Sequence, residues 1–293
     1  MDIESKKFLG QPKNFVSIFN ALLFDGQPVL KPEYLKDENS ELIMNVSSKH
    51  VDIIKRYEDG TYLDLFVIES QSYVDPSMVA RVMEYESVAR MRYIRQNFKK
   101  HVPMHTRLPM ILTVVLYVGE SKWNAAKRLS ELEIIHPGFE DMFNEFKLNL
   151  IELNTNHKYN TGEKATQDFF DLLRMIYRKQ ILKEDLDREF NRDALYFAYV
   201  VTKNKELLNI YQESEKGDVK VCRALDEMFE ESTNKGIQMG IKQGIEKSVE
   251  RGVKNTQIKI AIKMLVRNNQ TLEEISEIVG LDLDALKELK NSI

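Results

Sequence analysis

Two nearly continuous apolar runs constrain the fold of this chain more than any other feature. The first is TYLDLFVIES at residues 61–70, in which Phe66 and Ile68 share one side-chain parity and Leu65 and Val67 share the other. The second is LPMILTVVLYVG at residues 108–119. Runs this short that are apolar on both parities are typical of β-strands covered on both faces. The sequence therefore predicts two central strands of a sheet.

A helical pattern lies between these two runs. The stretch VDPSM places Asp75 where an N-cap acid is expected and Pro76 at the first helical position, and the pattern runs to about Asn97. A helix that joins two buried strands is a crossover connection. This order predicts an α/β or α+β sheet with helices packed on it.

Further elements complete the expected sheet domain. Residues 51–71 read as a hairpin that turns at EDG, and EFKLNLIELN at residues 145–154 alternates like another strand. A helix with one apolar face is predicted over NFVSIFNALLFDG, and the proline-broken stretch after it is predicted to be irregular. We place the sheet domain at residues 1–155 and an entirely helical region at residues 156–235.

The remaining segment, residues 236–293, begins with a repeat of glycines. Gly236, Gly240, Gly244 and Gly252 follow a four-residue period, and each precedes Ile or Val. Each glycine costs a helix about 1 kcal/mol relative to alanine. The sequence predicts a mobile helix that gains order by packing against a partner or a second copy, or that serves as a helical linker.

Two short helices are predicted at the end of the chain, in TLEEISEIVGLDLDALKEL. Thr271 and Glu274 form a capping box, and Gly280 marks the break between the helices. The pattern is helix-turn-helix-like, but Asp282 and Asp284 at the start of the second helix would repel phosphates. Packing or self-association is therefore favoured over base readout.

Composition excludes several classes of protein. The 42 Lys and Arg residues nearly balance the 46 Asp and Glu residues, so any site for a polyanion must be local. The single cysteine, Cys222, excludes an internal disulfide framework and, with only five histidines, a Cys/His zinc module. The chain has no apolar run of about 18 residues and starts with the polar stretch MDIESKKFLGQPK, which predicts a cytoplasmic protein with no membrane association.

Acidic residues occur on the predicted strands where apolar residues are expected. Glu69 and Gln71 are two positions apart, so their side chains leave the same face about 6–7 Å apart, and Asp52 comes from the neighbouring strand of the hairpin. Two carboxylates that converge at one sheet end make an oxygen-ligand site suited to Mg²⁺. The other interpretation is that Asp52 and Glu69 are strand-end residues that reach solvent. Spacing alone leaves both interpretations open.

Several segments, in order, resemble a known family over residues 14–155. They include FNALLFDGQPVLKPEYL, VDIIKRYEDG, DLFVIESQSYVDPSMVARVMEYES and LPMILTVVLYVGESKWN. Family members show a D-[VIL]-x-K strand, an acid-x-Gln strand end and an M-x-x-R-V-M-x-Y-[DE] helix. On these motifs the chain is similar to the Rpn or YhgA-like recombination-promoting nucleases, also described as putative transposases. The resemblance implies the PD-(D/E)XK fold, a restriction-endonuclease-like α/β fold with a central mixed sheet flanked by helices, followed here by an all-helical C-terminal region.

The resemblance also implies roles for particular residues. Asp52 and Glu69 would be catalytic residues that bind Mg²⁺ or Mn²⁺. Gln71 would be the third catalytic residue, and it stands where the wider superfamily usually has lysine. A neutral amide can orient a water molecule but cannot offset the charge of a phosphate. Lys55 does not replace the lysine, because three positions along a strand put it on the face opposite Asp52.

Two further residues are assigned supporting roles by the resemblance. Arg81, on the helix after the hairpin, is a candidate for supplementary positive charge, and the alternative is a structural or solvated arginine. Asp25 matches the family's N-A-x-L-x-D-G pattern, and the alternative is a turn residue that stops the first helix. Both alternatives are open.

Basic side chains are concentrated in RMRYIRQNFKKH, residues 90–101. A nuclease must hold backbone phosphates, which requires local Lys and Arg. The residues expected to bind DNA are Arg90, Arg92, Arg95, Lys99 and Lys100. The same pattern is also usual for a solvated helix face.

Taken with the resemblance, these features predict a Mg²⁺-dependent DNA endonuclease that hydrolyses phosphodiester bonds and serves DNA recombination or mobile-element activity. The alternative is a catalytically weak or inactive nuclease-fold protein that acts as a DNA- or protein-binding module, because Gln71 departs from the lysine pattern. The C-terminal helices are candidates for forming a homo-oligomer.

Overall fold

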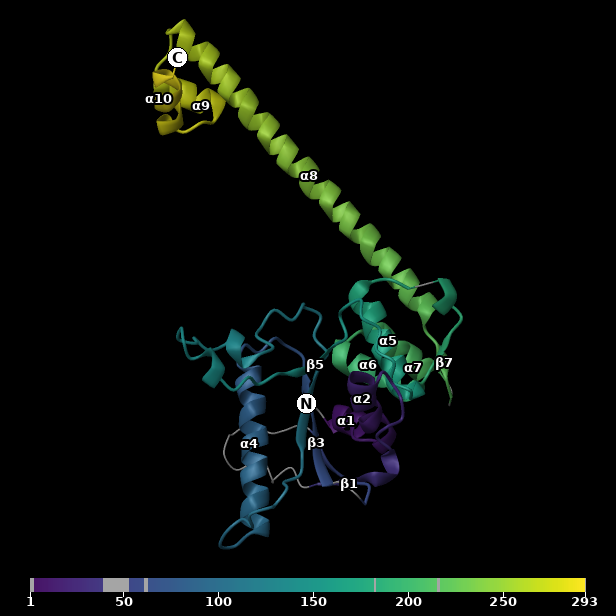
Figure 1. The fold of residues 1–293 in the computed structure, drawn as a ribbon. Helices are drawn as coiled ribbons and strands as arrows, with labels where there is room; N and C mark the ends of the chain where they lie inside the picture. Colours follow the sequence, from purple (N-terminus) through teal and green to yellow (C-terminus); the bar gives the residue numbers. More distant parts are fainter. Residues whose placement is uncertain (1–2, 39–52, 61–62, 182, 215–216, 293) are drawn as a thin grey trace. The chain divides into compact units, whose positions relative to one another are not determined.

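The computed structural model describes residues 3–38, 53–60, 63–181, 183–214 and 217–292 (Figure 1). The chain divides into two compact units, residues 1–226 and residues 227–293. Each unit is described by itself. The three-part division expected from the sequence, with boundaries after residues 155 and 235, stays a prediction.

The first unit is built on a five-stranded mixed sheet with strand order β1-β2-β3-β4-β5. Its strands are β1 (Leu35–Asp37), β2 (Ile53–Glu58), β3 (Leu63–Gln71), β4 (Ile111–Tyr117) and β5 (Asn149–Glu152). The first three strands pair antiparallel, and β3, β4 and β5 pair parallel. The predicted hairpin and the two central strands are confirmed. β1 was not predicted, and β5 is shorter than the expected strand at residues 145–154.

Helix α4 (Met78–Asn97) covers one face of this sheet, and α1 (Ile3–Leu9), α2 (Pro12–Phe24) and the helices after β5 lie on the other side (Figure 1). On the α4 face, Leu65 and Val67 of β3 pack against Tyr85 and Ala89. On the opposite face, Phe66 of β3 stacks on Phe19 of α2, with ring centroids 4.8 Å apart. β3 is therefore buried on both sides, as its apolar run predicted.

The rest of the first unit consists mainly of helices, which are α5 (Lys164–Arg178), α6 (Arg192–Thr202) and α7 (Lys205–Glu213). α5 packs on α2 and α6, and α6 packs on α1 and α7. Two short strands, β6 (Glu189–Phe190) and β7 (Val219–Lys220), pair antiparallel, so the prediction of an entirely helical region was wrong in this detail. Short 3-10 turns complete the unit at Pro32–Tyr34, Leu129–Glu131, Glu140–Met142 and Lys183–Asp185.

A single long helix, α8 (Cys222–Arg267), leads into the second unit and is followed by α9 (Leu272–Val279) and α10 (Leu283–Asn291). Ala261, Ile275, Val279 and Leu286 form the buried core of these three helices. The capping box of Thr271 and Glu274 and the break at Gly280, which has φ 71°, are both present as predicted. None of the helices in the described ranges is long and apolar enough to cross a membrane.

Candidate active site on the α4 face of the sheet

Glu69 and Gln71 lie at the carboxyl end of β3, on the face that α4 covers. They pair with Val115 and Tyr117 of the parallel strand β4 and share the parity of the buried Val67. Both side chains are only 4% exposed. Glu69 therefore does not reach solvent, and the interpretation of Glu69 as a surface acid is wrong. The carboxyl end of parallel strands is the usual place for a ligand site in an α/β sheet.

Asp52 lies outside the described residues. The first described residue of β2, Ile53, pairs with Ile68, the neighbour of Glu69 in β3. Antiparallel pairing thus brings the start of β2 to the same sheet edge as the end of β3. The assignment of Asp52 as a metal ligand stays a prediction.

Lys55 lies on the other face of the sheet. It pairs with Phe66, the residue that stacks on α2, and its Nζ binds Oδ1 of Asp37 in β1 at 2.5 Å. The side chain is buried. Lys55 therefore cannot supply positive charge on the face that carries Glu69 and Gln71, as the strand spacing predicted.

Arg81 supplies the positive charge beside Glu69. Its Nη2 donates to Oε1 of Glu69 at 3.0 Å, and its Nη1 donates to Oδ2 of Asp75 at 2.5 Å. The hydroxyl of Tyr85, one turn further along α4, accepts from Nε at 3.1 Å and from Nη2 at 2.8 Å. One guanidinium thus bridges two carboxylates and a phenol, and it is largely buried. Charge-assisted hydrogen bonds of this kind are the strong ones in proteins.

The environment favours the charged forms of Arg81 and Asp75 and the neutral form of Tyr85. Burial of Arg81 opposes its charge, but hydrogen bonds to Tyr85 and Asp75 and the charge of Glu69 raise the pKa of Arg81 above its ordinary value. Burial alone would raise the pKa of Asp75, yet hydrogen bonds from Ser77 and Arg81 lower it below the ordinary value. Burial also raises the pKa of the Tyr85 phenol, which stays protonated. At neutral pH the cationic Arg81 therefore pairs with the ionised carboxylate of Asp75 and lies 3.0 Å from Oε1 of Glu69.

Asp75 does not cap α4 as predicted. The helix begins at Met78 with Ser77 at the N-cap position, and Pro76 precedes it in a turn. Oδ1 of Asp75 accepts from the backbone N–H of Ser77 at 2.8 Å and from its hydroxyl at 2.7 Å, which leaves Oδ2 for Arg81. The carboxylate that reads as a helix cap in the sequence therefore binds a buried arginine.

Hard oxygen donors, which Mg²⁺ and Mn²⁺ prefer, are present at the end of β3. Glu69 provides a buried carboxylate, and the amide of Gln71 lies two positions along on the same face. Nε2 of Gln71 is buried and has no hydrogen-bond partner among the described residues. The described ranges contain no group of three or more His, Cys, Asp or Glu residues placed to hold a metal. The donors fit a divalent cation in type, and the second carboxylate assigned to it is Asp52.

A family model described as "Putative transposase, YhgA-like" matches residues 27–207. The chain belongs to the YhgA-like putative transposase family. The matched range contains all five strands of the main sheet, helix α4 and the Glu69–Arg81 pair. No curated protein and no solved structure matches the chain.

Asp25, the first supporting residue expected in this YhgA-like chain, stands at the C-cap of α2 in the left-handed conformation, with φ 50° and ψ 40°. The backbone N–H of the next residue, Gly26, donates to the carbonyl of Asn20, and the carbonyl of Asp25 accepts from the side-chain amide of Asn160. The residue is exposed, and α2 covers the face opposite Glu69. Its position is that of a residue that ends a helix.

The expected DNA-binding residues are spread along the second half of α4 and beyond it. Arg90 binds Oε2 of the buried Glu86 at 2.9 Å, and Oε1 of Glu86 accepts from the backbone N–H of Thr113 in β4. Arg92 is partly buried. The three remaining residues are exposed, Arg95 near the end of the helix and Lys99 and Lys100 after it. These three are best placed to contact phosphates, whereas Arg90 is also held by a structural carboxylate.

Sequence reasoning missed Asp75 and Tyr85 as members of this site in the YhgA-like chain. Tyr85 is in the family motif, but a tyrosine at helical spacing reads as an ordinary core residue. The spacing of Arg81 and Tyr85, four positions apart on one helix face, is the signal that could have paired them. Glu152 of β5 was also missed. It pairs with Tyr117 on the α4 face and binds Lys127.

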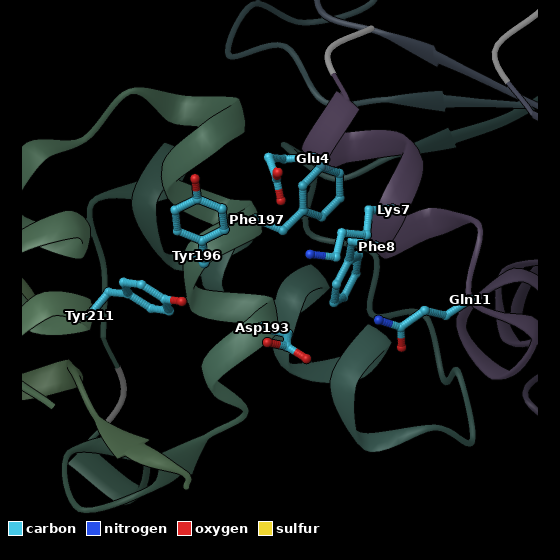
Figure 2. Close-up of a pocket in the computed structure, with 8 residues that line it drawn as sticks. All are labelled: Glu4, Lys7, Phe8, Gln11, Asp193, Tyr196, Phe197 and Tyr211. Carbon is cyan, nitrogen blue, oxygen red and sulfur yellow. The ribbon is translucent and has the colours of Figure 1, made fainter. Parts of the chain in front are cut away.

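A separate pocket of about 120 Å³ lies elsewhere in the first unit, between α1, α6 and α7 (Figure 2). Figure 2 shows Lys7 and Phe8 of α1 facing Phe197 and Asp193 of α6. The full lining is Glu4, Lys7, Phe8, Gln11, Asp193, Tyr196, Phe197 and Tyr211. The pocket shares no residue with the Glu69 cluster.

Proposed function

We propose that this YhgA-like chain is a Mg²⁺- or Mn²⁺-dependent DNA endonuclease with a PD-(D/E)XK-type fold, acting in DNA recombination. The observation that carries the proposal is a charged cluster on a buried sheet face. Glu69 and Gln71 are two positions apart at the carboxyl end of β3, so their buried side chains are on the same face of the sheet. Arg81 binds Glu69 on that face. A buried acid at a sheet end, paired with a buried arginine, is costly for folding and typical of functional sites.

The chain's own residues divide the work of phosphodiester hydrolysis. Asp52 and Glu69 hold the divalent ion, which when bound supplies Lewis acidity for the scissile phosphate and for a water molecule. The amide of Gln71 orients the attacking water by hydrogen bonds. Arg81 lies beside Glu69 and offsets the negative charge that develops on the phosphate, the task that a lysine at position 71 would perform.

The exposed basic residues Arg95, Lys99 and Lys100 contact the DNA backbone in this proposal. Contacts to phosphates position the duplex but carry no sequence information. Each such contact also releases counterions from the DNA, so the rate of cleavage should fall steeply as the salt concentration rises.

The decisive assay is Mg²⁺-dependent nicking of supercoiled plasmid by the purified full chain. We expect Glu69→Gln and Asp52→Asn to reduce the rate more than about 100-fold, because even groups that merely orient a metal ligand are worth about 10–100-fold. Glu84→Gln is the matched control, since Glu84 is an exposed acid on α4. Nicking that survives both site substitutions would overturn the assignment.

A second candidate function is a DNA- or protein-binding module with little or no catalysis. The observation that favours it is the Gln71 amide where the superfamily usually has lysine, together with the ion pair that already engages Glu69. In that case wild-type protein would bind plasmid DNA in a salt-sensitive manner without cutting it at any Mg²⁺ concentration.

A further inference from the structure

Arg81 has two partners other than Glu69, and each of them makes at least one contact shorter than the contact to Glu69. The Asp75 contact is 2.5 Å long, the two contacts to Tyr85 are 3.1 and 2.8 Å, and the contact to Glu69 is 3.0 Å. Three of the four hydrogen bonds of the guanidinium thus come from residues that are not assigned to bind metal. These hydrogen bonds can keep the guanidinium in place when Glu69 binds a divalent cation instead of Arg81.

Asp75 is itself fixed independently of Arg81. The backbone N–H and the hydroxyl of Ser77 both donate to its Oδ1, so that Oδ2 faces the guanidinium. The side chain is about nine-tenths buried. Ser77 thus fixes the carboxylate of Asp75, and Tyr85 fixes the guanidinium of Arg81. The ion pair is therefore preorganised, because each partner is held in position by a residue outside the pair.

We propose that Asp75 is a positioning residue that neutralises and anchors Arg81, so that Glu69 can accept a divalent cation while the arginine remains beside it. This inference rests on the proposed metal-dependent function. With Asp75 ionised, Arg81 has a counter-ion outside the proposed metal site, so it stays beside the site without needing the charge of Glu69, and Glu69 can bind the metal. Without Asp75, the full charge of Arg81 faces both Glu69 and any cation that approaches it.

The size of the effect follows from Coulomb's law. A unit charge several ångströms from a divalent ion changes the binding constant by about tenfold even at the dielectric constant of water, and by more in a partly buried site. A purely structural role for Asp75 would change stability but not the affinity of correctly folded protein for a cation. Cation affinity in the absence of DNA therefore separates the two roles.

The test is isothermal titration of the full chain with Mn²⁺ and with Mg²⁺, without DNA. We expect Asp75→Asn to weaken cation binding at least about tenfold, because it removes one negative charge and keeps the shape and the Ser77 contacts. Tyr85→Phe is the matched control, since it removes two hydrogen bonds from Arg81 and no charge. It should change the affinity less than Asp75→Asn does.

A double variant shows whether Asp75 acts through Arg81. In an Arg81→Gln background, Asp75→Asn should weaken cation binding less than it does in the wild-type background, because only the direct charge of Asp75 is then lost and no arginine remains to be released toward Glu69. An equal loss in both backgrounds would overturn the inference. Asp75→Glu, which keeps the charge, should bind cations nearly as well as wild type, and a loss as large as that of Asp75→Asn would also count against it. Thermal unfolding of each variant confirms that it is folded.

The outcomes for the site and for the inference are distinguishable. Wild-type protein that binds no divalent cation, or that binds one equally well with Glu69→Gln, overturns the proposed metal site and the inference with it. Wild-type binding that needs Glu69 but is the same within twofold in Asp75→Asn overturns the inference alone.

Discussion

Glu69 is the residue whose surroundings decide the character of the site. A buried carboxylate near the end of an apolar strand loses most of its hydration on folding, and this loss is tolerated only when a partner replaces the water. Arg81 is one such partner, and Asp75 and Tyr85 hold it in turn. The α4 face of the sheet thus carries a buried polar cluster of Glu69, Arg81 and Asp75 in addition to two clusters of apolar side chains.

The lowered pKa of Asp75 gives the protein a measurable acid sensitivity. Because the folded-state pKa lies below the ordinary value, the ionised carboxylate stabilises the fold above the ordinary carboxyl range. That contribution is lost as the pH falls through the folded-state pKa. We expect the free energy of unfolding to fall less between pH 7 and about pH 3 in Asp75→Asn than in wild type.

Urea unfolding at a series of pH values measures this difference. Asp141→Asn is the control, because Asp141 is an exposed acid in the short 3-10 turn after β4. It should leave the pH profile unchanged. If Asp75→Asn and wild type lose the same stability on acidification, the ion pair with Arg81 does not contribute to folding.

At the residue scale, the sequence could place Glu69 and Gln71 on one strand face but could not show their depth. Strand parity follows from the covalent geometry of the chain, so the separation of Lys55 from this face was predictable. Burial depends on what α4 and β4 place above and beside the strand. The partners of Arg81 could not be predicted for the same reason, since Asp75 also satisfies every local rule for an N-cap.

At the scale of elements, α8 stands apart because a stripe of apolar residues along its middle has no cover among the described residues. Ile237, Ile241, Ile245, Val249 and Val253 recur every four positions, and each is more than half exposed. A four-residue period advances about 40° per step around a helix of 3.6 residues per turn, so these residues form a slowly winding stripe. The glycines beside them have open space where a side chain would be, which would let another helix approach closely.

We propose that a second copy of the chain covers this stripe. Ile245→Glu should then shift the full chain toward monomer, because it places a charge in the middle of the apolar contact. Gln243→Glu is the matched control, since it adds the same charge two positions away on the opposite side of the helix. Light scattering after size-exclusion chromatography measures the mass. If Ile245→Glu and wild type have the same solution mass, or if wild type is a monomer, a second copy does not cover the stripe.

The elements themselves show where local sequence rules suffice. Long apolar or amphipathic segments such as β3, β4 and α2 were predictable because periodicity and burial agree. β1 was missed because Leu35–Asp37 is short and is defined by its pairing with β2 rather than by its own pattern. The start of α4 was placed too early because Pro76 fits the first helical position equally well as a turn residue.

At the scale of the whole molecule, the two units have separate hydrophobic cores. Leu116 of β4 is fully buried in the first unit, and Leu286 of α10 is fully buried in the second. We expect two unfolding transitions in scanning calorimetry. Leu286→Ala should lower the midpoint temperature of only the smaller transition, and Leu116→Ala that of only the larger. Each substitution should lower the free energy of unfolding of its own unit by about 2–5 kcal/mol.

These two substitutions control for each other, because they remove the same atoms from different cores. A single cooperative transition that both variants shift equally would mean that the units unfold together. In that case the long helix α8 would transmit stability between them rather than merely join them.

The core of the first unit is closed by contacts between distant parts of the chain. Ser17 of α2 donates to the hydroxyl of Thr166 in α5, and β3 pairs in parallel with β4 across the whole of α4. Contacts of such high sequence separation form slowly, because long loops must close first. On the ribosome, the helical layer that α2 begins on this side of the sheet can be completed only after α5 has been synthesised. Nascent chains that end before α5 should leave Ser17 of α2 without its partner Thr166 and depend on chaperones.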